Sequence, residues 1–227
     1  AHRSLGGHVV VAGPKNRSTN KQLSDDLAQT TNRIWDDWSS VRRRMQKEQR
    51  LFDVEPDTDA SGPLRVTFPE GWNIVRMTTA MLSTNRYVYK CHMPLGPSDT
   101  QQAKARLSEL ERFMVGFQHE ADLSLVRRGQ YPLQTQVAFF AALRGWIATQ
   151  TLLLKDVPNG GFPYQVNVFD PIDCACTYDD GGISQFVRKY KDTWSAVRRR
   201  ADRLGWNTRG VSADDNEMVD VVDFYDG

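Results

Sequence analysis

Cysteine is scarce in this sequence, and its spacing argues against both a disulfide framework and a common zinc site. The chain has 227 residues and three cysteines, Cys91, Cys174 and Cys176, whereas small disulfide-stabilised domains carry a larger and even set. One residue separates Cys174 from Cys176, but a zinc knuckle needs at least two residues between its cysteines. We therefore expect both side chains to be buried on one face of a strand, in a reducing compartment and without a metal or other cofactor.

Neither sign of charge predominates, and no apolar run is both long and unbroken. The 29 Lys and Arg residues nearly equal the 28 Asp and Glu residues, and the net charge of +1 argues against a protein that coats nucleic acid through bulk positive potential. The most apolar stretch, residues 137–154, is interrupted by Arg144, Gly145 and Gln150. It predicts a helix from about residue 133 to residue 154 that is buried in protein, and we expect no membrane contact.

The motifs of common enzymes are also missing. The sequence has no glycine-rich phosphate loop, no Gly-x-Ser-x-Gly turn and no dinucleotide fingerprint. His119-Glu120 begins like a zinc-protease motif, but Leu123 stands where the second histidine belongs. We therefore predict that the protein is not an enzyme and has no catalytic residue.

Four aspartates leave one enzymatic alternative open. Asp170, Asp173, Asp179 and Asp180 lie close together in sequence, and such a cluster is able to bind a divalent cation or to supply a general acid and base. The simpler explanation is structural, because Asp170 precedes a strand-ending proline and Asp179-Asp180 begins a glycine-containing turn. A metal-dependent phosphodiesterase or nuclease is therefore the last alternative that we retain.

The composition is that of a globular protein, and helical patterns fill its first half. Hydrophobic residues make up 40% and charged residues 25% of the chain, as in ordinary folded domains. Apolar residues at helical spacing predict helices over about 19–54 and 72–83 and from residue 98 onward, with Ile74, Met77 and Met81 as the inner face of the second helix. We expect a flexible arm over residues 1–18 and short strands at 66–68 and 86–91.

In the second half the apolar period changes from helical to alternating. Alternation predicts strands at 162–168, 174–178, 185–191 and 218–225, with a hairpin turn at Asp179–Gly182. A basic helix, capped by Asp192 and ended by Gly205, is expected between the last two strands. The predicted fold class is α+β: a helical first half, then a small antiparallel sheet with an inserted basic helix.

Two arginine triplets stand out as candidate contact residues. They are Arg42-Arg43-Arg44 and Arg198-Arg199-Arg200, with Arg203 one turn further on. Three consecutive residues spread around a helix, so at least one arginine in each triplet should flank the buried seam. The others are predicted either to contact DNA phosphates or a neighbouring subunit, or to form an ordinary solvated face, and the sequence leaves both interpretations open.

The second half resembles the wing region of the portal proteins of tailed bacteriophages. The stretches that carry the resemblance are LRGWIATQTLLL, FPYQVNVFDPIDC, TYDDGGISQFVRKYK and VDVVDFYDG, and Phe169-Asp170-Pro171 and Tyr178–Gly181 match best. The likeness covers the last ninety-odd residues well and the remainder loosely. It implies that residues 19–227 form one wing-like domain, which we expect to be a piece of a longer chain.

By this resemblance, the protein is a structural subunit of a ring, usually dodecameric, at one vertex of the virion capsid and assembled in the host cytoplasm. The implied partners are identical subunits, the major capsid protein, the terminase, adaptor or tail proteins, and double-stranded DNA in transit. A head–tail adaptor or a minor capsid protein is the alternative. The stem and clip of a portal are not in this sequence, so no DNA-contact residue is transferred.

Six tryptophans exceed what the core requires, and we expect some of them between subunits: Trp35, Trp38, Trp72, Trp146, Trp194 and Trp206.

Overall fold

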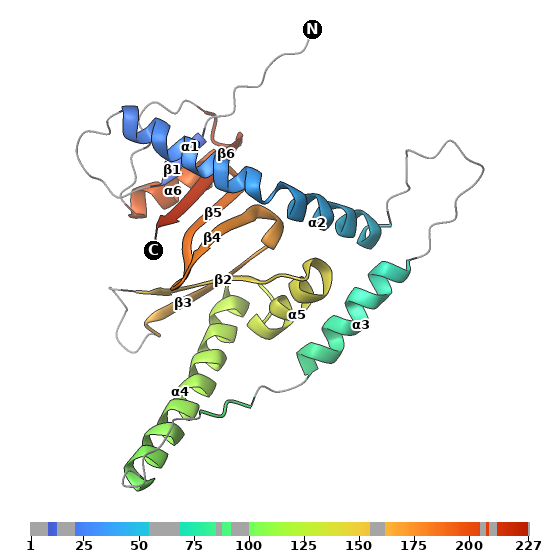
Figure 1. The fold of residues 1–227 in the computed structure, drawn as a ribbon, viewed down its shortest axis with the longest axis vertical. Coiled ribbons are helices and arrows are strands. Elements are labelled where there is room, and N and C mark those ends of the chain that lie inside the picture. Colours follow the sequence, from blue (N-terminus) through green and yellow to red (C-terminus); the bar gives the residue numbers. More distant parts are fainter. Residues whose placement is uncertain are drawn as a thin grey trace. The chain divides into compact units, whose positions relative to one another are not determined.

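The structure is a computed structural model that describes residues 9–12, 21–54, 69–84, 88–91, 100–154, 162–204, 208 and 213–226. The chain is α+β, with helices in the first half and small antiparallel sheets with one helix in the second, as predicted (Figure 1). In chain order the elements are β1 (Val9–Ala12), α1 (Lys21–Asp37), α2 (Ser39–Phe52), α3 (Glu70–Thr84), α4 (Thr100–Arg127), α5 (Leu133–Arg144), β2 (Ala148–Leu153), β3 (Tyr164–Phe169), the 3-10 turn η1 (Pro171–Asp173), β4 (Cys174–Asp179), β5 (Gly182–Thr193), α6 (Trp194–Leu204) and β6 (Met218–Asp226).

The chain divides into two compact units. Unit 1 combines residues 1–44 with 171–227, and unit 2 contains residues 45–170. Of the predicted arm, Val9–Ala12 form β1, and the other residues up to 18 lie outside the described part. None of the described helices is long and apolar enough to cross a membrane.

Unit 1 is a four-stranded sheet with a helix on each face. The strand order is β1-β6-β5-β4, with β1 parallel to β6 and the other pairs antiparallel. Successive residues of a strand point to opposite faces. One face packs on α1 through Ile34, Ala175, Val187 and Val222, and the other on α6 through Trp194, Val197, Val219 and Val221.

Local signals give β4, β5, β6 and α6 as predicted, but the helix predicted over 19–54 is divided at Trp38 into α1 and α2, and one helix cap differs. The predicted helix end at Gly205 lies outside the described residues. The β4–β5 turn forms at 179–182, where Gly182 has a φ of 123° and the Asp179 carboxylate accepts a 2.8 Å hydrogen bond from the Gly181 N–H. The proposed Asp192 cap is wrong, because α6 begins at Trp194 and the Asp192 carboxylate accepts from the Thr193 N–H instead. The first helical N–H groups, of Trp194 and Ser195, donate to the backbone carbonyls of Glu217 and Asp215.

Unit 2 contains helices α3, α4 and α5 and the β2–β3 hairpin, and it corrects the longest predicted helix. Residues 133–154 are not one helix: α5 ends at Arg144, Gly145 adopts a left-handed φ of 68°, and β2 follows. Glycine ends helices in this conformation without the steric penalty of a Cβ. A short apolar run does not distinguish a strand from a buried helix. The predicted strand at 162–168 accordingly pairs with β2 in unit 2 rather than with the sheet of unit 1.

The inner face predicted for the helix at 72–83 is also wrong. In α3, Val75 is buried, whereas Ile74, Met77 and Met81 are exposed. The helix approaches its neighbour closely at Gly71, where an added Cβ would lie 3.1 Å from the Leu51 carbonyl oxygen. The covered side of α3 is therefore the one that carries Gly71 and Val75, and the helix packs mainly on α5.

The strand predicted at 86–91 is not seen in its described part. Residues 88–91 are irregular and run along α4: the Tyr89 hydroxyl donates to Gln118 Oε1 at 2.8 Å, and the Cys91 N–H donates to Glu111 Oε1 at 3.0 Å. The strand predicted at 66–68 lies outside the described residues.

Candidate functional site

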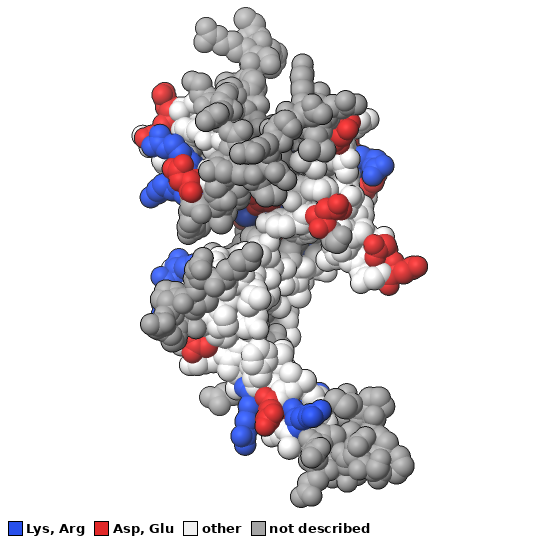
Figure 2. Space-filling model, turned by 90° about the vertical axis from the view of Figure 1, so that its left-hand side faces the viewer, with Lys and Arg blue, Asp and Glu red and all other residues white. Residues whose placement is uncertain are grey.

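On one face of the molecule, charged residues of both signs occur among the described residues (Figure 2). On the face drawn in Figure 2, blue and red atoms lie near one another, and no broad region of one sign is seen among the described residues. What the two arginine triplets can bind therefore depends on the contacts of each guanidinium.

The first triplet is divided between a half-buried and two exposed arginines. The Arg42 guanidinium carbon lies 3.9 Å from the centre of the Trp35 ring, and the Lys189 ammonium approaches the same ring at 5.0 Å. Burial lowers the pKa of Arg42, and the nearby Asp36 carboxylate partly offsets that effect. Arg43 and Arg44 are exposed. The structure thus confirms that one arginine of this triplet flanks the buried seam.

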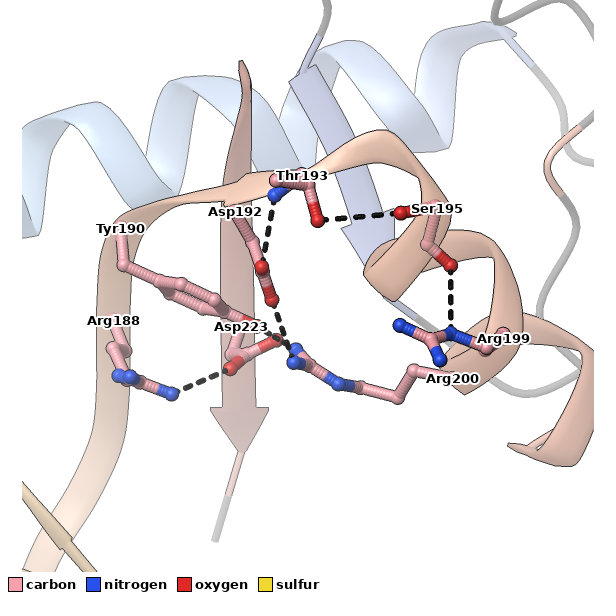
Figure 3. Close-up of polar contacts among 8 residues, drawn as sticks. All are labelled: Arg188, Tyr190, Asp192, Thr193, Ser195, Arg199, Arg200 and Asp223. Carbon is pink, nitrogen blue, oxygen red and sulfur yellow. Dashed lines mark hydrogen bonds and ion pairs between the residues drawn. The ribbon is translucent and has the colours of Figure 1, made fainter. Parts of the chain in front are cut away.

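The second triplet is divided in the same way (Figure 3). Arg200 Nη2 donates to Asp192 Oδ2 at 2.8 Å, and its Nη1 donates to the Tyr190 hydroxyl. Arg198 is exposed and pairs with Asp215 at 3.2 Å, a solvated contact of small energetic value. Arg199 is exposed, and its Nε donates to the Ser195 carbonyl oxygen. The side chain of Arg203 lies outside the described part.

Arg200 belongs to a polar cluster around a buried carboxylate that the sequence interpretation missed. Asp223 of β6 is buried and lies opposite Arg188 of β5, with 3.7 Å between Oδ2 and Nη1. Burial raises the pKa of Asp223, while Arg188, Arg200 and a hydrogen bond with Tyr190 oppose the shift. Burial and the Asp223 charge raise the pKa of Tyr190 to about 12, against the effect of the two arginines.

This cluster holds α6 against the sheet. Its two arginines, Arg188 and Arg200, face two carboxylates, those of Asp192 and Asp223, so the formal charges cancel. Figure 3 shows these side chains converging from β5, β6 and α6. A signal for Asp223 was present in the sequence, because it shares the inward-facing alternation of Val219 and Val221.

The four aspartates have separate roles. Asp170 accepts a bidentate pair of hydrogen bonds from Arg144, at 3.0 Å from Nε and 2.8 Å from Nη2. Arg144 is almost fully buried, and its Nη1 donates to the Met45 carbonyl oxygen. Asp173 lies in η1, and Asp179 and Asp180 lie at the β4–β5 turn. No group of three or more His, Cys, Asp or Glu side chains among the described residues is arranged to hold a metal ion.

The cysteines of β4 match the expectation of small buried side chains. Cys174 and Cys176 are buried thiols that form no disulfide, and burial raises the pKa of the Cys176 thiol. Tryptophan burial is uneven: Trp194 is in the core cluster on the α6 face of the sheet, Trp35 and Trp38 pack against the cluster on the α1 face, and Trp72 and Trp146 are exposed. Trp206 lies outside the described residues.

Comparison with known proteins adds no relative. Neither a protein-family model nor a curated protein sequence matches this chain.

Proposed function

We propose that this chain is the wing part of a portal subunit, a structural protein that assembles with identical copies into a ring at a capsid vertex. The observation that carries the proposal is the exposure of large apolar side chains on α3 and α4, among them Met77 and Phe113. Soluble proteins rarely leave adjoining apolar residues of this size in water unless another molecule covers them. A ring of copies provides such a covering surface at every subunit.

The distribution of charge supports a passage for DNA rather than a tight DNA-binding protein. Three of the six triplet arginines, Arg42, Arg198 and Arg200, contact a side chain of unit 1, and the other three are exposed. Each additional phosphate contact strengthens binding and its salt dependence. A subunit past which DNA has to move needs few cations available to phosphates, because each such contact would hold the DNA in place.

The remaining partners follow from the same proposal. The ring would contact the major capsid protein, dock the terminase during packaging, and later bind adaptor or tail proteins. The Arg144–Asp170 pair supports a structural role for the Phe169-Asp170-Pro171 motif, since the carboxylate is already engaged by a guanidinium.

Electron microscopy of the full-length protein tests the proposal. Negative-stain images are expected to show rings with a central channel, and a monodisperse monomer at micromolar concentration would count against it. Mass per ring and position in the particle distinguish a portal from a head–tail adaptor or a minor capsid protein.

A further inference from the structure

The exposed apolar residues of α3 form a one-sided stripe. Ile74, Met77 and Met81 are 64%, 66% and 62% exposed. At about 100° per residue these three positions share one side of the helix, roughly a third of a turn from the buried Val75. We call Ile74, Met77 and Met81 the α3 stripe. From Ile74 to Thr84 the only charged residue of this helix is Arg76.

A second exposed apolar surface lies where α4 meets the β2–β3 hairpin. The apolar face of α4 is buried toward its C-terminal end, at Ala121 and Leu125, but continues to Leu110, which is 46% exposed, and beside it lies Phe113 at 48%. The Phe113 ring lies 6.3 Å from that of Tyr164 in β3, and Leu153, 69% exposed, pairs with Tyr164 across the hairpin. We call Leu110, Phe113, Leu153 and Tyr164 the α4–hairpin patch.

These two surfaces belong to different elements of unit 2. Helix α3 packs on α5, whereas α4 packs on β3 as well as on α5. A ring is built from heterologous contacts, in which one surface of a subunit meets a different surface of the next. A single self-complementary patch would close a dimer, but two distinct apolar patches on one subunit are what a head-to-tail contact requires.

The size of the two patches fits one contact between copies. Large side chains present on the order of 200 Å² each, so the exposed fractions leave roughly 300 Å² of apolar surface on each patch, within the range of functional patches on monomers. Mated together they supply somewhat more than a third of the roughly 1,600 Å² that a standard interface buries. Such a contact is weak between two isolated copies and becomes strong only when ring closure adds further contacts, as avidity requires.

We infer that the α3 stripe of one copy packs against the α4–hairpin patch of the next. This inference rests on the proposed function, because it names the surfaces through which identical subunits meet. The occupant of each patch is thus a second copy of this chain, joined head to tail.

Cysteine cross-linking tests the contact. In the 227-residue chain, the double variant Met77→Cys with Phe113→Cys is expected to form dimers and longer ladders with a short bis-maleimide, with links between residues 77 and 113 of different copies identified by mass spectrometry. Each single variant is expected to stay at the wild-type background set by the native cysteines. Leu110→Cys replaces Phe113→Cys if loss of the aromatic ring impairs folding.

A matched control separates this contact from random collision. Val126→Cys, at a position 53% exposed on α4 and about 20 Å along the helix from Phe113 on its other side, is combined with Met77→Cys and is expected to give no ladder. Links between two copies of residue 77 would mean a self-complementary contact and would overturn the inference, as would the absence of links above the wild-type level. Rings in the microscope without the 77–113 link would sink this contact alone, whereas the absence of rings would sink the proposed function.

Discussion

At the scale of single residues, the two carboxylates that matter most are those with arginine partners far away in sequence. Asp170 pairs with Arg144, and Asp223 lies near Arg188 and Arg200. A buried ion pair adds little net stability compared with apolar residues of similar shape. Removing one partner is nevertheless destabilising, because it leaves the other charge buried without compensation. Both pairs therefore give specific predictions about stability and pH.

Replacement of Arg144 is expected to destabilise unit 2 strongly. Arg144→Ala removes three hydrogen bonds and leaves the Asp170 carboxylate without its guanidinium, at a cost of about 3 kcal/mol of unfolding free energy. Urea denaturation measures the loss. Arg199→Ala, at an exposed position, is the control and should change stability by less than about 0.5 kcal/mol. A loss below about 1 kcal/mol for Arg144→Ala contradicts the structural role.

Asp223 gives a prediction about pH. The pKa of Asp223 in the folded protein lies above its ordinary value of 3.8, so the folded protein keeps this proton at pH values where the unfolded chain has lost it. The stability that the protonated Asp223 carboxyl contributes is fully present below the pKa of the unfolded chain. It is lost as the pH rises through the higher pKa of the folded protein. Because Asp223→Asn cannot titrate, its stability relative to wild type should rise over the same range and then level off.

Urea denaturation of both proteins from about pH 4 to about pH 7 measures this difference, since all other titrating groups are common to the two. A difference that stays constant over the range, or that falls as the pH rises, would show that burial of Asp223 does not shift its pKa upward.

At the scale of elements, helices α2 and α5 are both followed by a residue with a positive φ. Helix α5 ends at Gly145, where glycine suits the left-handed conformation. Helix α2 ends differently, because Val54 has a φ of 58° although it is β-branched. Such a residue in the left-handed region is an outlier that its surroundings have to stabilise.

At position 54 we therefore expect a glycine variant to be more stable than an alanine variant, which is the reverse of the usual order. Both Val54→Gly and Val54→Ala remove most of the side chain, but only Val54→Gly also removes the Cβ. We expect Val54→Gly to be more stable than Val54→Ala by about 1 kcal/mol, whereas elsewhere glycine is usually the less stable of the two. Thermal denaturation of the two variants decides the order, and an alanine variant equal to or more stable than the glycine variant would argue against strain at this position.

At the scale of the whole molecule, each compact unit has its own buried residues. The core clusters around Val187 and Val197 consist of unit 1 residues alone. Leu125 is buried within unit 2. Local stability in such a chain is expected to differ between units, because cooperative opening follows shared buried contacts.

Core truncations should therefore loosen one unit at a time. Val187→Ala is expected to reduce hydrogen-exchange protection across β4, β5 and β6 and to leave α5 and β3 close to wild type. Leu125→Ala, with a cost of about 2–5 kcal/mol, is expected to do the reverse. Loss of protection in both units from either single variant would mean that they unfold as one.

The type and order of most elements followed from the sequence alone, because short-range rules govern them. Alternation predicted β4, β5 and β6, and the glycines at 181 and 182 predicted the turn between the first two. The helical period predicted α3 and α4. The spread of three consecutive residues around a helix predicted that one arginine in each triplet, Arg42 and Arg200, would be drawn toward the core.

Tertiary structure alone decided the partners. The exposed stripe of α3, the strand after Gly145 and the guanidinium at Asp170 all depend on residues distant in the chain. A helical or alternating pattern specifies that a face is apolar, but not which neighbour reaches it first or how closely. Gly71 illustrates the reason: an added Cβ there would lie 3.1 Å from the Leu51 carbonyl oxygen, and close packing is sensitive to differences of one methyl group. The helical period of α3 does not reveal that distance, nor that α5 is the main neighbour of this helix.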